Sequence, residues 1–149
     1  MKINYKKIST SAREPFKTHD EDFCYDVIAT SMEYLNEKVI KYNLGLAFQI
    51  CRTDNQKSDG KIYSIDFRPR SSVWKTGLSL ANCTGTIDEL YRGEVSVIFY
   101  HVIEDLPIYK VGDKIGQIKI GITEPIEFEE SAELNETKRG SNGFGSTDK

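Results

Sequence analysis

Short runs of strand-forming residues make up most of the central part of the chain. In residues 94–103, for example, Val95, Val97 and Phe99 occupy every second position, which is the period of a strand with one buried face. Further strands are expected at 3–8, 44–51, 61–68 and 114–122. Short strands separated by turn-forming residues are typical of an antiparallel sandwich or barrel, so we predict an all-β fold.

Three intervening segments follow other patterns. Residues 32–42 hold apolar residues at helical spacing, whereas 38–42 also alternates, so the pattern leaves helix and strand open. Residues 53–60 are polar throughout and are expected to form the tip of a hairpin. Residues 72–75 are expected to form a short helical turn with Ser71 as its N-cap.

The C-terminal segment differs in composition from the rest of the chain. Residues 127–136 contain five glutamates and few residues to bury, which indicates a solvated linker. Residues 138–147 then combine two cations with glycines, hydroxyls and one aromatic ring, a composition suited to closing over phosphate groups, although an inert tail is the alternative. We therefore divide the chain into a β-barrel domain at 1–126 and a linker with a glycine-rich arm at 127–149.

Composition and charge exclude several classes of protein. The 149 residues carry 20 Lys and Arg against 23 Asp and Glu, a net charge of −3, so we expect no stable nucleic-acid binding. Three widely spaced cysteines and two histidines disfavour a zinc site or a disulfide framework. No run approaches the ~18 apolar residues of a membrane span, and the N-terminus lacks the apolar stretch of a signal peptide. We expect a cytoplasmic protein without membrane contact.

Two segments carry residues suited to binding a nucleotide. Arg70 and the two serines after it follow an expected strand and open a helical turn, where a guanidinium, hydroxyls and free N–H groups can bind phosphate oxygens. A glycine-bearing hairpin expected at 83–87 would expose backbone groups able to read the edge of a base, with Asp88 and Tyr91 close by. Taken alone, residues 70–72 fit an ordinary capped turn better than a phosphate site, and Asp88 and Tyr91 are more often a solvated acid and a half-buried ring.

Five segments in order resemble the motifs of the trimeric dUTPase (dUTP diphosphatase) family. They are CYDV at 24–27, PRSS at 69–72, GTIDELYRGE at 85–94, GDKIGQ at 112–117 and RGSNGFGST at 139–147. The resemblance implies a distorted antiparallel jelly-roll β-barrel and favours strand over helix for 32–42. It also implies a homotrimer, in which each active site draws motifs from more than one chain and the arm reaches over a neighbouring subunit's site.

The same resemblance implies an activity. The expected reaction is Mg²⁺-dependent hydrolysis of dUTP to dUMP and pyrophosphate by attack of water on the α-phosphorus, which keeps uracil out of DNA and supplies dUMP for thymidylate synthesis. One alternative is an enzyme of the dCTP deaminase type on a similar barrel, although the base there is a glutamate further along the strand. Another is a nucleotide-sensing or partner-binding protein on the same scaffold.

Residue roles are carried over by position from the family. Asp88 is expected to be the general base, Gln117 to orient the attacking water or bind the α-phosphate, and Arg70 to neutralise phosphate charge. Asp26 is expected to contact Mg²⁺ through water. Tyr91 is expected to lie against the deoxyribose and exclude a 2′-hydroxyl. Asn82 and the backbone of residues 84–87 are expected to read uracil, Phe144 to stack on the base, and Ser96 to make a further nucleotide contact. The other expected substrate contacts are Ser71, Ser72, Gly85, Thr86, Ile87, Arg139, Gly145, Ser146 and Thr147, of which Ser71, Ser72, Arg139, Ser146 and Thr147 are expected to bind phosphates.

Overall fold

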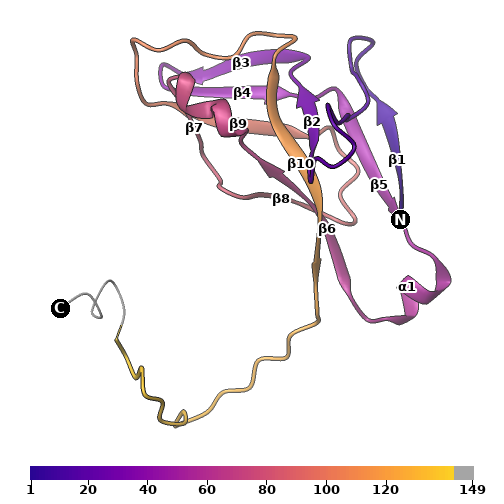
Figure 1. Cartoon of the computed structure of the whole chain (residues 1–149), viewed down its shortest axis with the longest axis vertical. Coiled ribbons are helices and arrows are strands. Elements are labelled where there is room, and N and C mark those ends of the chain that lie inside the picture. The colour runs from indigo at the N-terminus through magenta and orange to yellow at the C-terminus, as the bar shows by residue number, and fades with distance from the viewer. Residues whose placement is uncertain (143–149) are drawn as a thin grey trace.

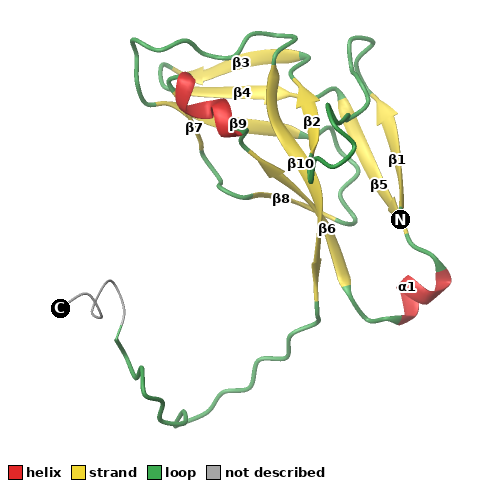
Figure 2. Ribbon diagram, viewed as in Figure 1, coloured by secondary structure: helices red, strands yellow, loops and turns green. Residues whose placement is uncertain are grey.

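The computed structural model describes residues 1–142, and its regular elements are nearly all strands (Figures 1 and 2). In chain order the strands are β1 (Lys2–Lys7), β2 (Tyr25–Ile28), β3 (Ser31–Asn36), β4 (Val39–Asn43), β5 (Leu46–Cys51), β6 (Ile62–Arg68), β7 (Leu78–Leu80), β8 (Gly85–Asp88), β9 (Ser96–His101) and β10 (Lys114–Thr123). The two short helices are α1 (Asp54–Ser58) and η1, a 3₁₀ turn at Ser71–Lys75. The all-β prediction is confirmed.

Every strand pairing is antiparallel, and the strands form three sheets. Their orders are β1-β5, β2-β10-β6-β8 and β3-β4-β9-β7. Strands that follow one another in the chain mostly belong to different sheets, so the chain crosses repeatedly between the two larger sheets. This crossing is the arrangement expected of a jelly-roll barrel.

The hydrophobic core lies between the two four-stranded sheets. Phe67 of β6 and Phe99 of β9 are fully buried, and their rings meet edge to face with centroids 6.4 Å apart. Tyr42 of β4 packs in the same way on Phe99 at 5.8 Å. Along β6, residues 63, 65 and 67 are buried and those between them are not, so the sheet of β2, β10, β6 and β8 presents a polar outer face.

The strands predicted from alternation are confirmed. Those expected at 3–8, 44–51, 61–68, 94–103 and 114–122 correspond to β1, β5, β6, β9 and β10. The ambiguous segment 32–42 forms the β3–β4 hairpin, as the family resemblance favours. In this hairpin Met32 and Tyr42 face each other across the two strands, so their apparent helical spacing comes from two strands and a turn.

The prediction of a hairpin tip at 53–60 is wrong. The segment contains α1, which starts with a capping box: the Thr53 hydroxyl accepts from the Gln56 N–H, and the Gln56 side chain accepts from the Thr53 N–H. The flanking strands do not pair, because β5 pairs with β1 whereas β6 pairs with β10 and β8. The segment is therefore a helical connection between two sheets.

Two further local predictions need correction. The expected hairpin at 83–87 is wrong, because β7 pairs with β9 and β8 pairs with β6, so residues 81–84 connect two sheets. Within the described residues β8 has one paired neighbour and lies at the edge of its sheet. Ser71 is the first residue of η1 and not its cap; Arg70 holds the cap position, without a side-chain cap hydrogen bond.

Residues 124–142 contain neither helix nor strand and are exposed, and they extend away from the sheets (Figure 1). The acidic linker therefore has no packed surface within this chain. The division of the chain at residue 126 stays a prediction. Neither helix in residues 1–142 has the length and apolar character that a membrane crossing requires.

Candidate active site

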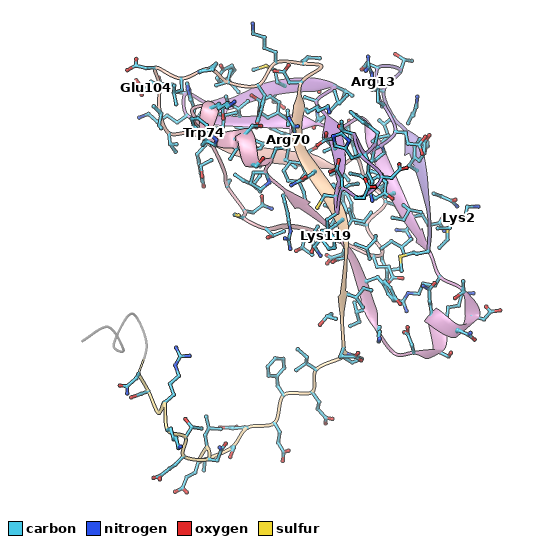
Figure 3. All side chains as sticks on the ribbon, viewed as in Figure 1. Lys2, Arg13, Arg70, Trp74, Glu104 and Lys119 are labelled. Carbon is cyan, nitrogen blue, oxygen red and sulfur yellow. The ribbon has the colours of Figure 1, made fainter. Side chains whose placement is uncertain are left out.

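Four of the predicted site residues line one groove of about 590 Å³. Asp26 of β2 faces Gln117 of β10 in the strand register, Arg70 enters from the loop between β6 and η1, and Ser71 is the first residue of η1. Figure 3 shows Arg70 beside β10. On the core side of β10, the ring of Phe67 packs against Gly116, where a Cβ would collide with it.

Electrostatically, the groove is organised around Asp26, whose side chain is 13% exposed. Its Oδ1 accepts a hydrogen bond from Arg70 Nε at 3.1 Å, and its Oδ2 accepts one from Lys114 Nζ at 2.8 Å. The guanidinium of Arg70 has further N–H groups that no described residue engages, so Asp26 orients Arg70 while leaving donors for an anion. Such charge-assisted donors suit phosphate oxygens.

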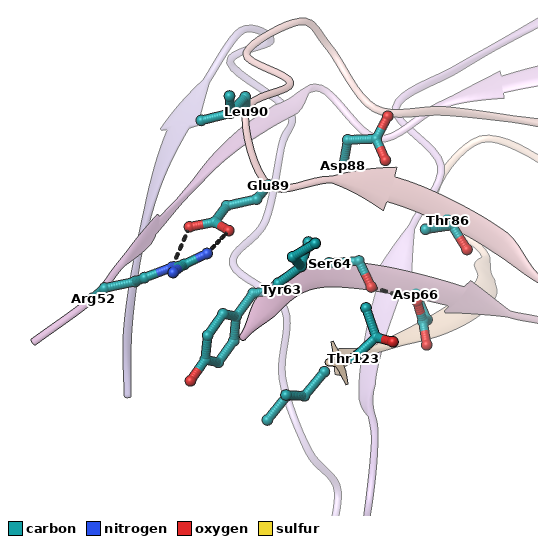
Figure 4. A pocket seen from close by; sticks show the side chains of 12 residues that line it. Arg52, Tyr63, Ser64, Asp66, Thr86, Asp88, Glu89, Leu90 and Thr123 are labelled. Atoms are coloured by element: carbon teal, nitrogen blue, oxygen red, sulfur yellow. Dashed lines mark hydrogen bonds and ion pairs between the residues drawn. The ribbon is translucent and has the colours of Figure 1, made fainter. Parts of the chain in front are cut away.

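A second group of predicted residues lies on β8 and the turn that follows it. Thr86 and Asp88 are exposed and line a separate pocket of about 800 Å³, shown in Figure 4. The turn closes where the Tyr91 N–H donates to the Asp88 carbonyl at 3.0 Å. The Tyr91 hydroxyl donates to the Glu94 carbonyl at 3.0 Å, and its ring lies over Gly93, where a Cβ would collide with it.

The remaining predicted residues are spread more widely. Ser72 is half-buried in η1, Asn82 is exposed, Gly85 is buried and Ile87 is half-buried against the core. Ser96 lies in the other sheet, where its hydroxyl donates to Asn43 at 2.6 Å. Arg139 is exposed and donates to the Asn142 carbonyl in the C-terminal segment. The predicted contacts outside the described residues are Phe144, Gly145, Ser146 and Thr147.

One chain does not bring the two groups together. Asp88 pairs with Ser64, which pairs with Gly121, whereas Gln117 lies four residues earlier on β10. At ~3.3 Å per residue along a strand and ~4.8 Å between strands, the Cα atoms of Asp88 and Gln117 are roughly 16 Å apart. Two parts of the site therefore lie at different places along one sheet. One is the groove lined by Asp26, Arg70, Ser71 and Gln117, and the other is the turn that follows Asp88.

Comparison with known proteins identifies the family. A family model for dUTPase matches residues 18–148. The chain belongs to the dUTPase family. Deoxyuridine 5′-triphosphate nucleotidohydrolases from Clostridium novyi and Clostridium kluyveri are 35% and 33% identical to it; the first alignment covers 99% of both chains, the second 99% of this chain and 98% of the relative.

Solved structures show the same fold. The Staphylococcus bacteriophage 80alpha dUTPase with dUpNHpp superposes with a TM-score of 0.77 at 23% identity, covering 97% of both chains. The dUTPase from phage phi11 of S. aureus has a TM-score of 0.69 at 20% identity, covering 92% of this chain and all of the other. The predicted jelly-roll fold is confirmed by this agreement.

Within this dUTPase-family site, sequence reasoning missed four charged residues. Lys114, Glu89 and Arg92 lie inside motif segments, where a role could have been suspected; Arg92 donates to the backbone carbonyls of Glu89 at 2.6 Å and Tyr91 at 2.9 Å. Arg52, which binds the Glu89 carboxylate, had no signal in the sequence, because its partner lies 37 residues away. Its two hydrogen bonds lower the pKa of Glu89 below the ordinary glutamate value.

Proposed function

We propose that this chain hydrolyses dUTP to dUMP and pyrophosphate, with water attacking the α-phosphorus. The observation that carries the proposal is the full-length match to relatives named deoxyuridine 5′-triphosphate nucleotidohydrolase, 35% identical over 99% of both chains. The accessible positions of Gln117 and Asp88 on one sheet, with Arg70 in the loop that follows β6, support it. Nothing in the comparisons favours the deaminase alternative.

We propose that the chain forms a homotrimer and that each site is formed between copies of the chain. Within one chain the Cα atoms of Asp88 and Gln117 are about 16 Å apart, and the two residues line separate pockets. A second copy that brings its β8 turn to the groove of the first would join the base to the phosphate-binding residues. The arm at 139–147 would close the site from a neighbouring chain, since residues 124–142 extend away from their own sheets.

The chain's own groups then divide the chemistry between them. The Asp88 carboxylate accepts a proton from the attacking water, and the amide of Gln117 orients that water or binds the α-phosphate. Arg70, Ser71 and Ser72 stabilise the charge that develops on the phosphate oxygens. Arg139, Ser146 and Thr147 would do so from the arm.

Substrate selection belongs to β8 and its turn. As an edge strand within residues 1–142, β8 has backbone N–H and C=O groups that no described strand uses, and these can read the edge of uracil. Asn82 and residues 85–87 supply this recognition, and the compact turn excludes the thymine methyl. Tyr91, held over Gly93, lies against the deoxyribose and leaves no room for a 2′-hydroxyl. Phe144 stacks on the base, and Ser96 supplies a further nucleotide contact.

The residues of the groove fit Mg²⁺ held outside direct protein coordination. Both carboxylate oxygens of Asp26 already accept hydrogen bonds from cations, and residues 1–142 offer no cluster of three His, Cys, Asp or Glu arranged around an ion. Mg²⁺ commonly keeps several waters and binds substrate phosphates, so Asp26 would contact it through water. The ion would neutralise phosphate oxygens when the triphosphate binds.

Pyrophosphate release from dUTP, UTP, dTTP and dCTP, measured with Mg²⁺, tests this function. We expect rapid release from dUTP alone. Ammonia is assayed in parallel with dCTP, because a deaminase would produce it and a diphosphatase would not. Ammonia release from dCTP, or equal hydrolysis of dUTP and dTTP, would contradict the proposal.

A further inference from the structure

An ion pair joins the α1 connection to the turn that follows β8. Arg52 Nε donates to Glu89 Oε1 at 2.6 Å, and Arg52 Nη2 donates to Glu89 Oε2, so the guanidinium grips the carboxylate with two parallel hydrogen bonds (Figure 4). The two side chains are 18% and 16% exposed. Shielded, bidentate pairs of this kind hold geometry better than exposed ones.

The pair lies next to the proposed catalytic base. β8 pairs with β6 as far as Asp88 opposite Ser64, so Glu89 is the first residue beyond the ladder. In Figure 4, Glu89 extends toward Arg52 while the Asp88 carboxylate points away from the pair. Fixing the Glu89 side chain therefore restricts the backbone rotations that aim Asp88.

Arg52 is itself supported by the segment that follows it. Its guanidinium lies over the ring of Tyr63, 4.7 Å from the centroid, and its Nη1 donates to the Gln56 carbonyl at 3.4 Å. The Tyr63 hydroxyl donates to Asp59 at 3.1 Å. The 53–59 segment thus contacts the arginine through the Gln56 carbonyl and holds the Tyr63 ring beneath it through Asp59.

We propose that Arg52 is a positioning residue for dUTP hydrolysis, holding Glu89 so that the neighbouring Asp88 is aimed at the attacking water. This inference rests on the proposed function. Arg52 lines the same pocket as Asp88 and Thr86, but among the described residues its hydrogen bonds go to Glu89 and the Gln56 carbonyl and to no predicted substrate contact. We therefore expect it to act on the chemical step more than on nucleotide affinity. A lysine would keep the charge and lose the two-point grip.

The test compares R52K, E89Q and the double variant R52K/E89Q. We expect each single variant to lower kcat about tenfold, within the ~10²-fold that a misplacement of about 1 Å can cost, with KM changed less than about twofold. The double variant should be no slower than the worse single variant, because both changes remove the same interaction. The matched control is K57M, which breaks the exposed Lys57–Asp54 pair on the same helix and should leave kcat unchanged.

Hydrogen exchange of residues 88–92 supplies a readout independent of turnover. It should quicken in R52K and stay as in the parent in K57M, with kcat measured well below every variant's unfolding temperature. R52K with a parental kcat, an equal loss in K57M, or a rise in KM at constant kcat would overturn the inference. If the parent chain hydrolyses no dUTP, the proposed function fails, and unchanged exchange in R52K would then reject the positioning role separately.

Discussion

The carboxylate of Asp26 fixes the positions of two neighbouring cationic side chains. It holds Arg70 from one oxygen and Lys114 from the other, so one carboxylate fixes two cations beside the groove while the chain as a whole is acidic. A triphosphate entering the groove meets donors already oriented. Preorganised charge of this kind costs no reorganisation during the reaction.

Replacing Asp88 with Asn should remove the proton acceptor and keep the shape of the side chain. We expect turnover of dUTP to fall at least ~10²-fold, the lower end of general-base contributions, while a non-hydrolysable dUTP analogue still binds. Pyrophosphate release and calorimetric titration measure the two effects. Near-parental turnover would remove Asp88 from the mechanism.

Tyr91→Ala should relax discrimination against the ribonucleotide. The ring is held in place by its hydrogen bond to the Glu94 carbonyl and by contact with Gly93, so it forms a fixed wall. Without it, kcat/KM for dUTP should fall while the ratio of UTP to dUTP hydrolysis rises. A variant that rejects UTP as strictly as the parent would place recognition of the 2′-position elsewhere.

At the scale of elements, β8 and the α1 connection form one unit through Arg52 and Glu89. The edge position of β8 leaves its end without strand neighbours on one side within the described part of the chain. Side-chain hydrogen bonds replace the missing ladder: Arg52 holds the Glu89 carboxylate, and Arg92 holds the Glu89 carbonyl. The turn is therefore fixed by charge instead of by strand pairing.

This link predicts a pH-dependent stability. Arg52 lowers the pKa of Glu89 in the folded chain below its ordinary value of 4.5. The pair's contribution is therefore complete above the unfolded pKa and lost as pH falls through the folded pKa. In urea unfolding, the stability gap between the parent and E89Q should stay constant from neutral pH down to the unfolded pKa and narrow as the pH falls further, through the lowered folded pKa.

The matched control for this experiment is E37Q. Glu37 is exposed and has no ion pair among the described residues, so its removal should leave the parent's pH profile unchanged. A gap between the parent and E89Q that is constant or widens toward acid would show that the pair does not stabilise the fold through charge.

Local pattern predicted the strands well because alternation records which face is buried. It failed at 53–60, although Thr53 and Gln56 carry the spacing of a capping box, since a helix of five residues is too short for periodicity to reveal. The error at 83–87 has another cause: which strands pair is decided by tertiary packing, so a turn between two sheets resembles a hairpin in sequence. The motifs located Asp88 and Gln117, but only the register of β10, β6 and β8 shows how far apart they lie.

At the scale of the whole molecule, residues 124–142 bear on how copies of the chain assemble. They bury nothing within their own chain, and Ile126, Phe128 and Leu134 are exposed to 68%, 91% and 86%. Large apolar side chains spaced among glutamates suit contact with another copy better than isolation in water. We therefore propose that residues 124–142 contact a neighbouring copy in the homotrimer, which would bring the arm that follows them to that copy's site.

Mixing two inactive variants tests that proposal. Chains carrying Asp88→Asn and chains lacking residues 138–149 should each be nearly inactive, while the truncated chain keeps the parent's melting temperature because the removed segment has little to bury. After subunit exchange, trimers that pair an intact Asp88 with an intact arm should regain activity. The mixture should be several-fold more active than the summed activities of the two variants measured separately. No recovery after verified exchange would contradict a site shared between copies.

Because Asp88 and Gln117 lie far apart along one sheet, the activity of the proposed shared site depends on the concentration of the protein. An enzyme whose site is complete in one chain keeps its specific activity on dilution, whereas a site divided among copies exists only while they are associated. Below the dissociation range of the assembly, the rate would fall more steeply than the amount of protein. Activity would then show a threshold in protein concentration, with little turnover until enough of the chain has been synthesised for its copies to associate.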